Sequence, residues 1–192
     1  MEKKTCSSVL GIVGSPRRGG NTEILVDQVL LGAAEAGATA QKVILSDLDI
    51  APCDACAACE DTGACTIADD MEDILQKMAG SDVWVLGTPV YWWGPSAQFK
   101  LFLDRWYSKS FLPEDKAMFK GRRIIVAIAM GDPDPATARH TVGMLSDAIS
   151  YLEAELFGTV LAPEVNDAGE VRQRPDLLEE ARRLGLEAVR RS

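Results

Sequence analysis

The chain has 192 residues, of which 47% are apolar and 26% are charged, a composition that excludes wholesale disorder and is typical of a globular protein with one large core. Its 29 acidic side chains outnumber its 20 basic ones and give a net charge of −9, which argues against nucleic acid or an anionic membrane surface as the main partner. No apolar run approaches the roughly 18 residues that a membrane span needs.

The first predicted element is a short apolar strand at residues 8–14, of the kind that is covered on both faces of a sheet. Lys3 and Lys4 precede it, as in a secretory signal, but the apolar stretch is short and ends at Pro16, so a core strand is the better interpretation. Five cysteines without an export signal predict a reducing, cytoplasmic compartment. Cys6, which stands alone before the strand, is interpreted as an ordinary buried thiol.

Helices and strands alternate along the rest of the chain. A helix is predicted at about 22–36, and Gly37 is placed to end it in a left-handed cap. Asp134 and Pro135 are predicted to be the N-cap and the first residue of a later helix. The other predicted strands are 43–45, 82–87, 124–130 and 156–161, the other predicted helices are 70–78, 96–106 and 176–190, and the segments 51–70 and 113–121 are predicted to be irregular.

Five buried strands that alternate with helices predict an α/β fold, a doubly wound parallel sheet with helices on both faces. We expect a single domain over residues 1–192, with a cysteine-rich insertion at about 51–70. Ligands of such sheets bind outside the carboxyl ends of the strands, at the topological switch point. The loops after the first, third and fourth strands are therefore the candidate sites.

The loop after the first strand has the composition of a phosphate-binding turn. It runs from Gly14 to Thr22 between a strand and a helix amino terminus, where free N–H groups and the helix dipole favour an anion. It lacks both the Gly-Lys-Ser/Thr ending of nucleoside-triphosphate loops and the G-x-G-x-x-G pattern. The alternative is a polar turn with a helix cap and two solvated arginines. The predicted binding residues are Ser15, Arg17, Arg18, Gly20, Asn21 and Thr22.

The pattern Gly14-Ser15-Pro16-Arg17, followed by Gly20-Asn21-Thr22, resembles the NADPH-dependent FMN reductase family, and the resemblance extends from about Val9 to Leu161. It implies a flavodoxin-like, three-layer fold with a five-stranded parallel sheet in the order 2-1-3-4-5. It also implies FMN as the cofactor, with its phosphate in this turn, and NAD(P)H as a transient electron donor. A homodimer or homotetramer is the assembly that it implies.

The loop after the third strand carries aromatic residues, Tyr91 to Trp93, which are costly to expose unless something flat stacks on them or another subunit covers them. An interface patch is the alternative, for Trp93 in particular. The resemblance implies flavin contacts at Pro89, Val90, Tyr91, Trp92 and Gly94. Gly131, after the fourth strand, is in the right place for a further contact with the ring. The residues interpreted as helix-surface or subunit-interface residues are Lys100, Asp104 and Arg105.

Four cysteines of the predicted insertion have the spacing C-x2-C-x2-C-x5-C, namely Cys53, Cys56, Cys59 and Cys65. Four thiolates are the ligand set of a [4Fe–4S] cluster, whereas a zinc site usually pairs two separated C-x2-C hooks, so a cluster is the first interpretation and zinc the second. The spacing resembles that of the iron–sulfur flavoproteins, a branch of the same superfamily, in which the cluster lies beside the flavin. Clusterless relatives carry similar loops, so free thiols are the third interpretation.

We therefore expect an FMN-dependent oxidoreductase that takes electrons from NAD(P)H or a ferredoxin and passes them through a [4Fe–4S] cluster and FMN to another acceptor. No side chain is an evident general base, and hydride or electron transfer needs none, so no catalytic residue is predicted. The alternatives are a clusterless NAD(P)H-dependent FMN or quinone reductase, a non-enzymatic electron carrier and a zinc-stabilised binding module.

Overall fold

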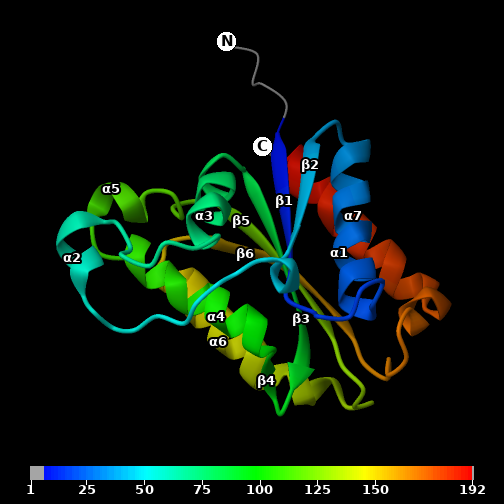
Figure 1. The fold of residues 1–192 in the computed structure, drawn as a ribbon. Coiled ribbons are helices and arrows are strands. Elements are labelled where there is room, and N and C mark those ends of the chain that lie inside the picture. Colours follow the sequence, from blue (N-terminus) through cyan, green and yellow to red (C-terminus); the bar gives the residue numbers. More distant parts are fainter. Residues whose placement is uncertain (1–6, 192) are drawn as a thin grey trace, which may run out of the picture.

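The structure is a computed structural model that describes residues 7–191, so Cys6 lies outside the described residues. The long strands are β1 (Ser8–Val13), β2 (Thr39–Ile44), β3 (Val83–Tyr91), β5 (Arg123–Ala129) and β6 (Glu155–Ala162). Within residues 7–191 they form a parallel sheet in the order β2-β1-β3-β5-β6 (Figure 1). A two-residue strand, β4 (Gly94–Pro95), pairs antiparallel with β3. Apart from β4, this is the predicted order of the five strands.

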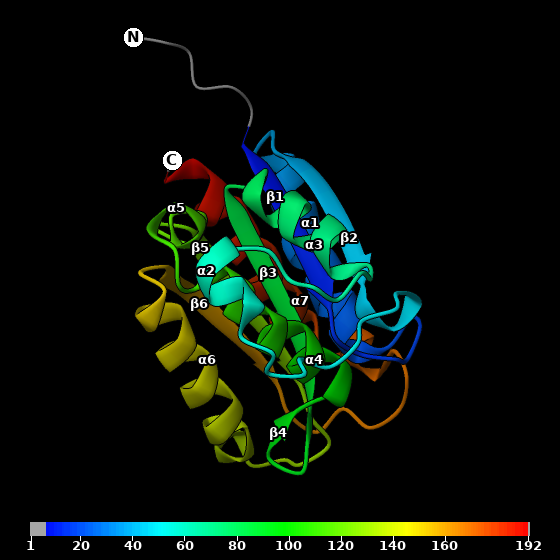
Figure 2. The same cartoon turned by 60° about the vertical axis from the view of Figure 1, so that its left-hand side comes forward.

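Helices cover both faces of the sheet, as predicted for a doubly wound fold (Figure 2). One face carries α1 (Asn21–Glu35) and α7 (Pro175–Arg190), and the other carries α3 (Met71–Ala79), α4 (Ala97–Asp104) and α6 (Arg139–Tyr151). Side chains of β1 alternate between the two cores. Val9 and Val13 belong to the core under α1 and α7, and Leu10 and Ile12 belong to the core on the opposite face.

Two glycines allow α1 and α7 to cross in close contact. A Cβ atom at Gly32 of α1 would lie 1.9 Å from the carbonyl oxygen of Arg182, and one at Gly185 of α7 would lie 1.9 Å from that of Val29. Neither contact is tolerable for a larger residue. The C-terminal helix is therefore held directly on the helix that follows the first candidate loop.

Two of the predicted helix boundaries are confirmed. Gly37 has a φ of +89°, and the N–H of Ala38 donates to the carbonyl oxygen of Ala33 at 3.1 Å, as in a Schellman cap. The carboxylate of Asp134 accepts a hydrogen bond of 2.9 Å from the N–H of Ala136, as expected of an N-cap. The element that follows starts as a 3-10 turn, η3 (Pro135–Ala138), and then continues as α6.

The segments predicted to be irregular contain two short helices, α2 (Ala58–Thr62) and α5 (Pro113–Lys116). Each spans about one turn, which is too short for an apolar period to show in the sequence. The other described 3-10 turns are η1 (Leu45–Asp47), η2 (Arg105–Lys109) and η4 (Glu170–Gln173). Among residues 7–191, no helix has the length and apolar character needed to cross a bilayer.

Candidate functional site

The loops after β1, β3 and β5 meet at the carboxyl edge of the sheet, where they line a cavity of about 150 Å³. A neighbouring hollow of about 180 Å³ shares Val90, Met130 and Gly131 with it, so the two lie side by side, and together they are called the depression below. The predicted contacts that line this depression are Arg17, Asn21, Thr22, Pro89, Val90, Tyr91, Trp92 and Gly131. Those that belong to the same loops but do not line it are Ser15, Arg18, Gly20 and Gly94.

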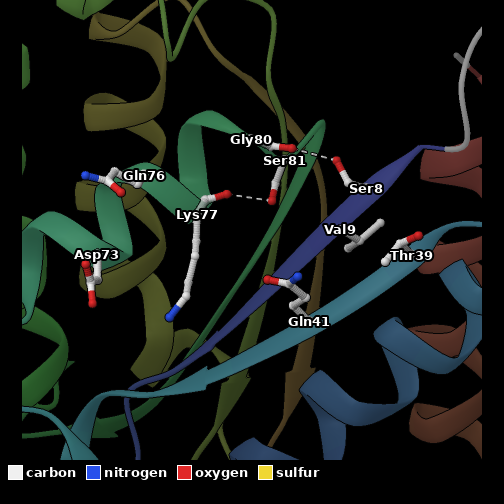
Figure 3. Close-up of a pocket in the computed structure, with 9 residues that line it drawn as sticks. All are labelled: Ser8, Val9, Thr39, Gln41, Asp73, Gln76, Lys77, Gly80 and Ser81. Carbon is white, nitrogen blue, oxygen red and sulfur yellow. Dashed lines mark hydrogen bonds between the residues drawn. The ribbon is translucent and has the colours of Figure 1, made fainter.

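A larger hollow, of about 470 Å³, lies near the opposite edge of the sheet, between β2 and the end of α3 (Figure 3). Two of its three hydroxyl groups are bound locally: Ser8 Oγ donates to the carbonyl oxygen of Gly80 at 2.9 Å, and Ser81 Oγ to that of Lys77 at 2.7 Å. Its lining contains no cysteine and no aromatic side chain. The chemistry predicted from the sequence is therefore concentrated at the carboxyl edge.

Buried hydrogen bonds hold the first two loops together. The N–H of Gly14 donates to the carbonyl oxygen of Gly87 at 2.7 Å, which joins the ends of β1 and β3. Ser96, which is fully buried at the N-cap of α4, donates its hydroxyl to the carbonyl oxygen of Gly14, and its N–H donates to Thr88 Oγ1 at 3.1 Å. Ser96 was not among the predicted site residues, although a serine just before an apolar helix is an N-cap signal.

The turn after β1 enters α1 without a side-chain cap, because its N-cap residue is Gly20. The first N–H groups of a helix have no intrahelical partner, and they attract anions. Glu23, the acidic residue of this first turn, accepts hydrogen bonds from Lys42 Nζ at 2.8 Å and from the N–H of Gly19 at 2.7 Å. Burial raises the pKa of Glu23, but these two partners outweigh burial and lower it. The negative charge of Glu23 is thus balanced by Lys42.

Asn21 turns its side chain toward the loop after β6. Its Nδ2 donates to the carbonyl oxygens of Val165 at 3.3 Å and Asp167 at 2.9 Å, and its Oδ1 accepts a hydrogen bond of 3.0 Å from the N–H of Val171. These bonds fix the start of α1 against that loop. The predicted contact between Asn21 and a phosphate stays a prediction.

The two arginines of the turn have different surroundings. Arg17 lines the cavity, and its Nη1 donates to the carbonyl oxygen of Asn166 at 2.8 Å. Arg18 is exposed and forms an ion pair with Asp47. Ser15 is buried, and its Oγ accepts a hydrogen bond of 3.3 Å from the N–H of Arg17. Of the two positive charges, that of Arg17 is therefore the one nearer to a ligand in the cavity.

The aromatic loop after β3 is a tight hairpin, which was not predicted. Tyr91 pairs with Gly94 across the turn, and the two central residues, Trp92 and Trp93, have φ values of +50° and +59°. Such turns usually contain Asn or Gly, because positive φ is strained for a bulky side chain. Trp92 is 91% exposed, and Thr141 Oγ1 donates to the carbonyl oxygen of Trp93 at 3.2 Å. The strained turn thus holds one indole out beside the depression.

Asn166, in the loop after β6, lines the cavity together with Gly131. A Cβ atom at Gly131 would lie 2.2 Å from Oδ1 of Asn166, so these two loops touch where Gly131 has no side chain. Asn166 was not predicted, because it lies outside the loops after the first, third and fourth strands. Its only sequence signal is its position just after the last predicted strand.

The cysteine loop, residues 51–70, lies beside the end of α4 and η2. Cys53 and Cys56 are exposed, Cys65 is half-buried and Cys59 is buried, and Ala55 and Ala57 have left-handed backbones with φ values of +57° and +60°. Burial raises the pKa of the Cys59 thiol, and the other three cysteines raise it further. Among residues 7–191, no three His, Cys, Asp or Glu side chains converge as a ligand set for one metal ion.

Arg105 was interpreted as a surface or interface residue, and that interpretation is wrong. Its side chain is 2% exposed and forms a two-fold ion pair with Asp69, which is 4% exposed, at 2.5 Å from Nη1 to Oδ2 and 3.1 Å from Nη2 to Oδ1. Its Nη2 also lies 3.4 Å from Sγ of Cys65. Lys100 and Asp104 are, as expected, exposed on α4, where they form an ion pair at 2.5 Å.

Comparison with protein families and individual proteins gives concordant results. The family model described as NADPH-dependent FMN reductase matches residues 7–164. An iron–sulfur flavoprotein of Methanocaldococcus jannaschii is 45% identical over 97 residues, which are 50% of each chain, and one of Methanosarcina thermophila is 34% identical over 139 residues, which are 72% of this chain and 71% of the other. The match therefore spans only half the length of the M. jannaschii protein.

Solved structures share the fold at low sequence identity. An NAD(P)H:quinone oxidoreductase from Methanothermobacter marburgensis superposes with a TM-score of 0.74 at 17% identity, over 95% of this chain and 98% of the other. An FMN-dependent NADH-azoreductase from Bacillus anthracis, in complex with FMN, superposes with a TM-score of 0.68 at 18% identity, over 96% and 99%. At these identities the likeness establishes the flavodoxin-like fold.

Proposed function

The chain belongs to the NADPH-dependent FMN reductase family, and from this premise we propose that it is an FMN-dependent oxidoreductase of the iron–sulfur flavoprotein kind. It takes electrons from NAD(P)H or a ferredoxin and passes them through a [4Fe–4S] cluster and FMN to a further acceptor. The observation that carries the proposal is the depression at the carboxyl edge, because the loops after β1, β3 and β5 line it together.

The residues of this depression suit FMN. The phosphate would lie at the uncapped start of α1, near Thr22 and the positive charge of Arg17. The ring would lie between Tyr91 and Trp92 on one side and Gly131 on the other, where only glycine fits against Asn166. When bound, FMN supplies the redox chemistry, and these residues hold it and limit the approach of water.

The second proposed cofactor is the [4Fe–4S] cluster, and the four thiols of the cysteine loop are the donor set that supports it. A zinc ion needs four ligands that converge on one point, whereas each iron of a [4Fe–4S] cluster takes its own thiolate. The motif supplies four thiols, one for each iron, and the other three lie close enough to Cys59 to raise its pKa. The buried Nε of Arg105 has no hydrogen-bond partner among the described residues, and a sulfur-rich group beside Cys65 is suited to accept from it. Cys53, Cys56, Cys59 and Cys65 are the proposed ligands.

We propose further that the chain works in the cytoplasm as a homodimer or homotetramer, without nucleic acid or membrane. The exposed aromatic side chains support such an assembly, since Trp92 and Phe111 are both available to a second subunit. The acidic net charge of −9 argues against polyanionic partners.

Protein prepared without oxygen tests the function. We expect a flavin spectrum, about four irons per chain and oxidation of NAD(P)H with a quinone or a one-electron dye as acceptor. Cys56→Ala should remove the iron and leave FMN bound. Zinc in place of iron would favour a zinc-stabilised binding module. Flavin without either metal would favour a clusterless reductase. Flavin and iron without oxidation of NAD(P)H would favour a non-enzymatic electron carrier.

A further inference from the structure

Arg105 lies where the two ends of the cysteine loop meet. Its Nη1 donates to the carbonyl oxygen of Ala51 at 2.9 Å, just before the first cysteine. Its ion-pair partner Asp69, just after the last cysteine, accepts hydrogen bonds from the N–H of Ala51 at 2.9 Å and from the N–H of Met71 at 3.0 Å. One buried pair thus binds the start of the loop, its end and the first turn of α3.

The same guanidinium reaches inside the loop. Its Nη2 lies within hydrogen-bonding distance of Sγ of Cys65, the last cysteine of the motif. The planar fork of arginine allows this, because it can face a carboxylate with two N–H groups and still offer others. The next cation along the chain, Lys109 at the end of η2, donates instead to the carbonyl oxygen of Gly63 and to the carboxylate of Asp115.

We propose that Arg105 is a positioning residue for the [4Fe–4S] cluster, which it holds and tunes through its hydrogen bond to Cys65 while it closes the loop with Asp69. The inference rests on the proposed function, since it presumes that Cys65 is a cluster ligand. It assigns a role to two buried charges that FMN binding does not require.

The charge of Arg105 has a definite effect on reduction. Reduction of the cluster adds one electron, taken in the experiment below from dithionite, and no proton is placed on Cys65. A positive N–H donor beside a thiolate ligand stabilises the more negative, reduced form and so raises the reduction potential. Asp69 has the opposite charge and lowers that potential. The two residues therefore have effects of opposite sign on one measured quantity.

The test uses the full chain loaded with FMN, iron and sulfide under anaerobic conditions. The variants are Arg105→Lys, Asp69→Asn and the double variant Arg105→Gln with Asp69→Asn. Arg182→Gln is the matched control, because it also removes one cation, but an exposed one that pairs with Glu35 on α1. The measurements are iron per chain, the rate of iron loss to a ferrous chelator, and the midpoint potential from a dithionite titration followed by electron paramagnetic resonance.

We expect Arg105→Lys to lose iron to the chelator roughly tenfold faster, because lysine keeps the charge but not the fork. Asp69→Asn should shift the midpoint potential upward from the wild type, and the double variant, which also removes the positive charge of Arg105, should have a lower potential than Asp69→Asn. Arg182→Gln should behave as the wild type. If the Arg105–Asp69 pair had a purely structural role, its variants would change the unfolding temperature. Their midpoint potentials would then not follow the sign of the charge that each variant removes.

Two results would overturn the inference, and they are distinguishable. Wild-type iron retention with unchanged potentials in all the variants would remove the role of Arg105 and leave the proposed function standing. Wild-type protein that binds FMN but takes up no iron would overturn the cluster and this inference together. If the double variant does not fold, iron loss in Arg105→Lys and the potential of Asp69→Asn decide the matter.

Discussion

The side-chain oxygen of Asn21 accepts a hydrogen bond of 3.0 Å from the N–H of Val171, a residue 150 positions later in the chain. Two further bonds from the amide nitrogen of Asn21 reach carbonyl groups of the same late loop. Because that loop also contributes Asn166 to the cavity, the start of α1 and the end of the sheet are linked around one depression.

Asn21→Ala should lower the free energy of unfolding of the FMN-free protein by about 1–3 kcal/mol, because the fully buried N–H of Val171 loses its acceptor. FMN affinity should fall as well, since the loop that carries Asn166 loses its attachment. Denaturant unfolding and flavin fluorescence titration measure the two effects. Arg18→Ala is the matched control: it breaks an exposed ion pair with Asp47 and should cost less than about 1 kcal/mol of stability. An equal loss of unfolding free energy in Asn21→Ala and Arg18→Ala would contradict this account.

Gly131→Ala should weaken FMN binding by about 1 kcal/mol or more, roughly fivefold, because the new Cβ overlaps Oδ1 of Asn166 and displaces one of the two loops. Adding Asn166→Gly should restore most of the affinity. Gly143→Ala serves as the control, since its Cβ meets no atom within 4 Å. The quantity to measure is the dissociation constant of FMN. Unchanged binding in Gly131→Ala would place the ring elsewhere.

Trp92→Asn should raise the stability of the FMN-free protein by about 1 kcal/mol, because asparagine tolerates the φ of +50° better than tryptophan does. Little apolar burial is lost, since Trp92 is 91% exposed. The same change should reduce FMN retention, because the indole borders the ring side of the depression. Thermal unfolding and bound flavin are measured on the same samples. Tyr151→Asn, at an aromatic residue that is 66% exposed on α6, should leave FMN retention unchanged.

The stability contributed by Asp69 should depend on pH. Burial raises the pKa of this carboxyl group, but hydrogen bonds from Arg105, Ala51 and Met71 outweigh burial and hold the pKa below its ordinary value. A carboxyl group with a lowered folded-state pKa stabilises the protein above its unfolded pKa, about 3.9, and this contribution is lost as the pH falls through the folded value. The wild type should therefore have a higher free energy of unfolding than Asp69→Asn. The difference should have its full size near pH 6 and should be smaller below about pH 4.

Denaturant titrations of the iron-free protein at several pH values measure this difference. A gap between wild type and Asp69→Asn that stays constant from neutral to acid pH would show that the ionised carboxylate is not the stabilising form. Urea is the suitable denaturant, because guanidinium salts screen ion pairs.

Local patterns were sufficient to place four of the long strands and two helix ends, but of β2, whose first four residues are exposed, only the end was predicted. Continuous apolar runs identified the buried strands, and Gly37 and Asp134 carry cap signals that act within a few residues. The approximate location of the site also followed, because strand order and the switch point depend on the alternation of elements. Two-thirds of the predicted cofactor contacts line the depression, while the assigned role of each remains a prediction.

Long-range contacts were not predictable in this way. Nothing near Asn21 in the sequence identifies Val171 as its partner. Arg105, next to exposed Lys100 and Asp104 on the preceding helix, has the sequence signature of a surface residue, and only the folded cysteine loop buries it. The Trp92–Trp93 turn lacks the Asn or Gly that marks such hairpins, so its geometry depends on the pairing of β3 with β4.

The ion pair of Arg105 and Asp69 makes the cysteine segment, residues 51–69, a unit that can be exchanged. Because Ala51 and Asp69 are bonded side to side, the intervening residues leave the body of the protein and return to it at nearly one point. An insertion between such points costs little closure entropy and leaves β2 and α3 in place. We therefore expect segments of different length or cysteine spacing to be accepted between these two points while the loops that line the depression keep their places.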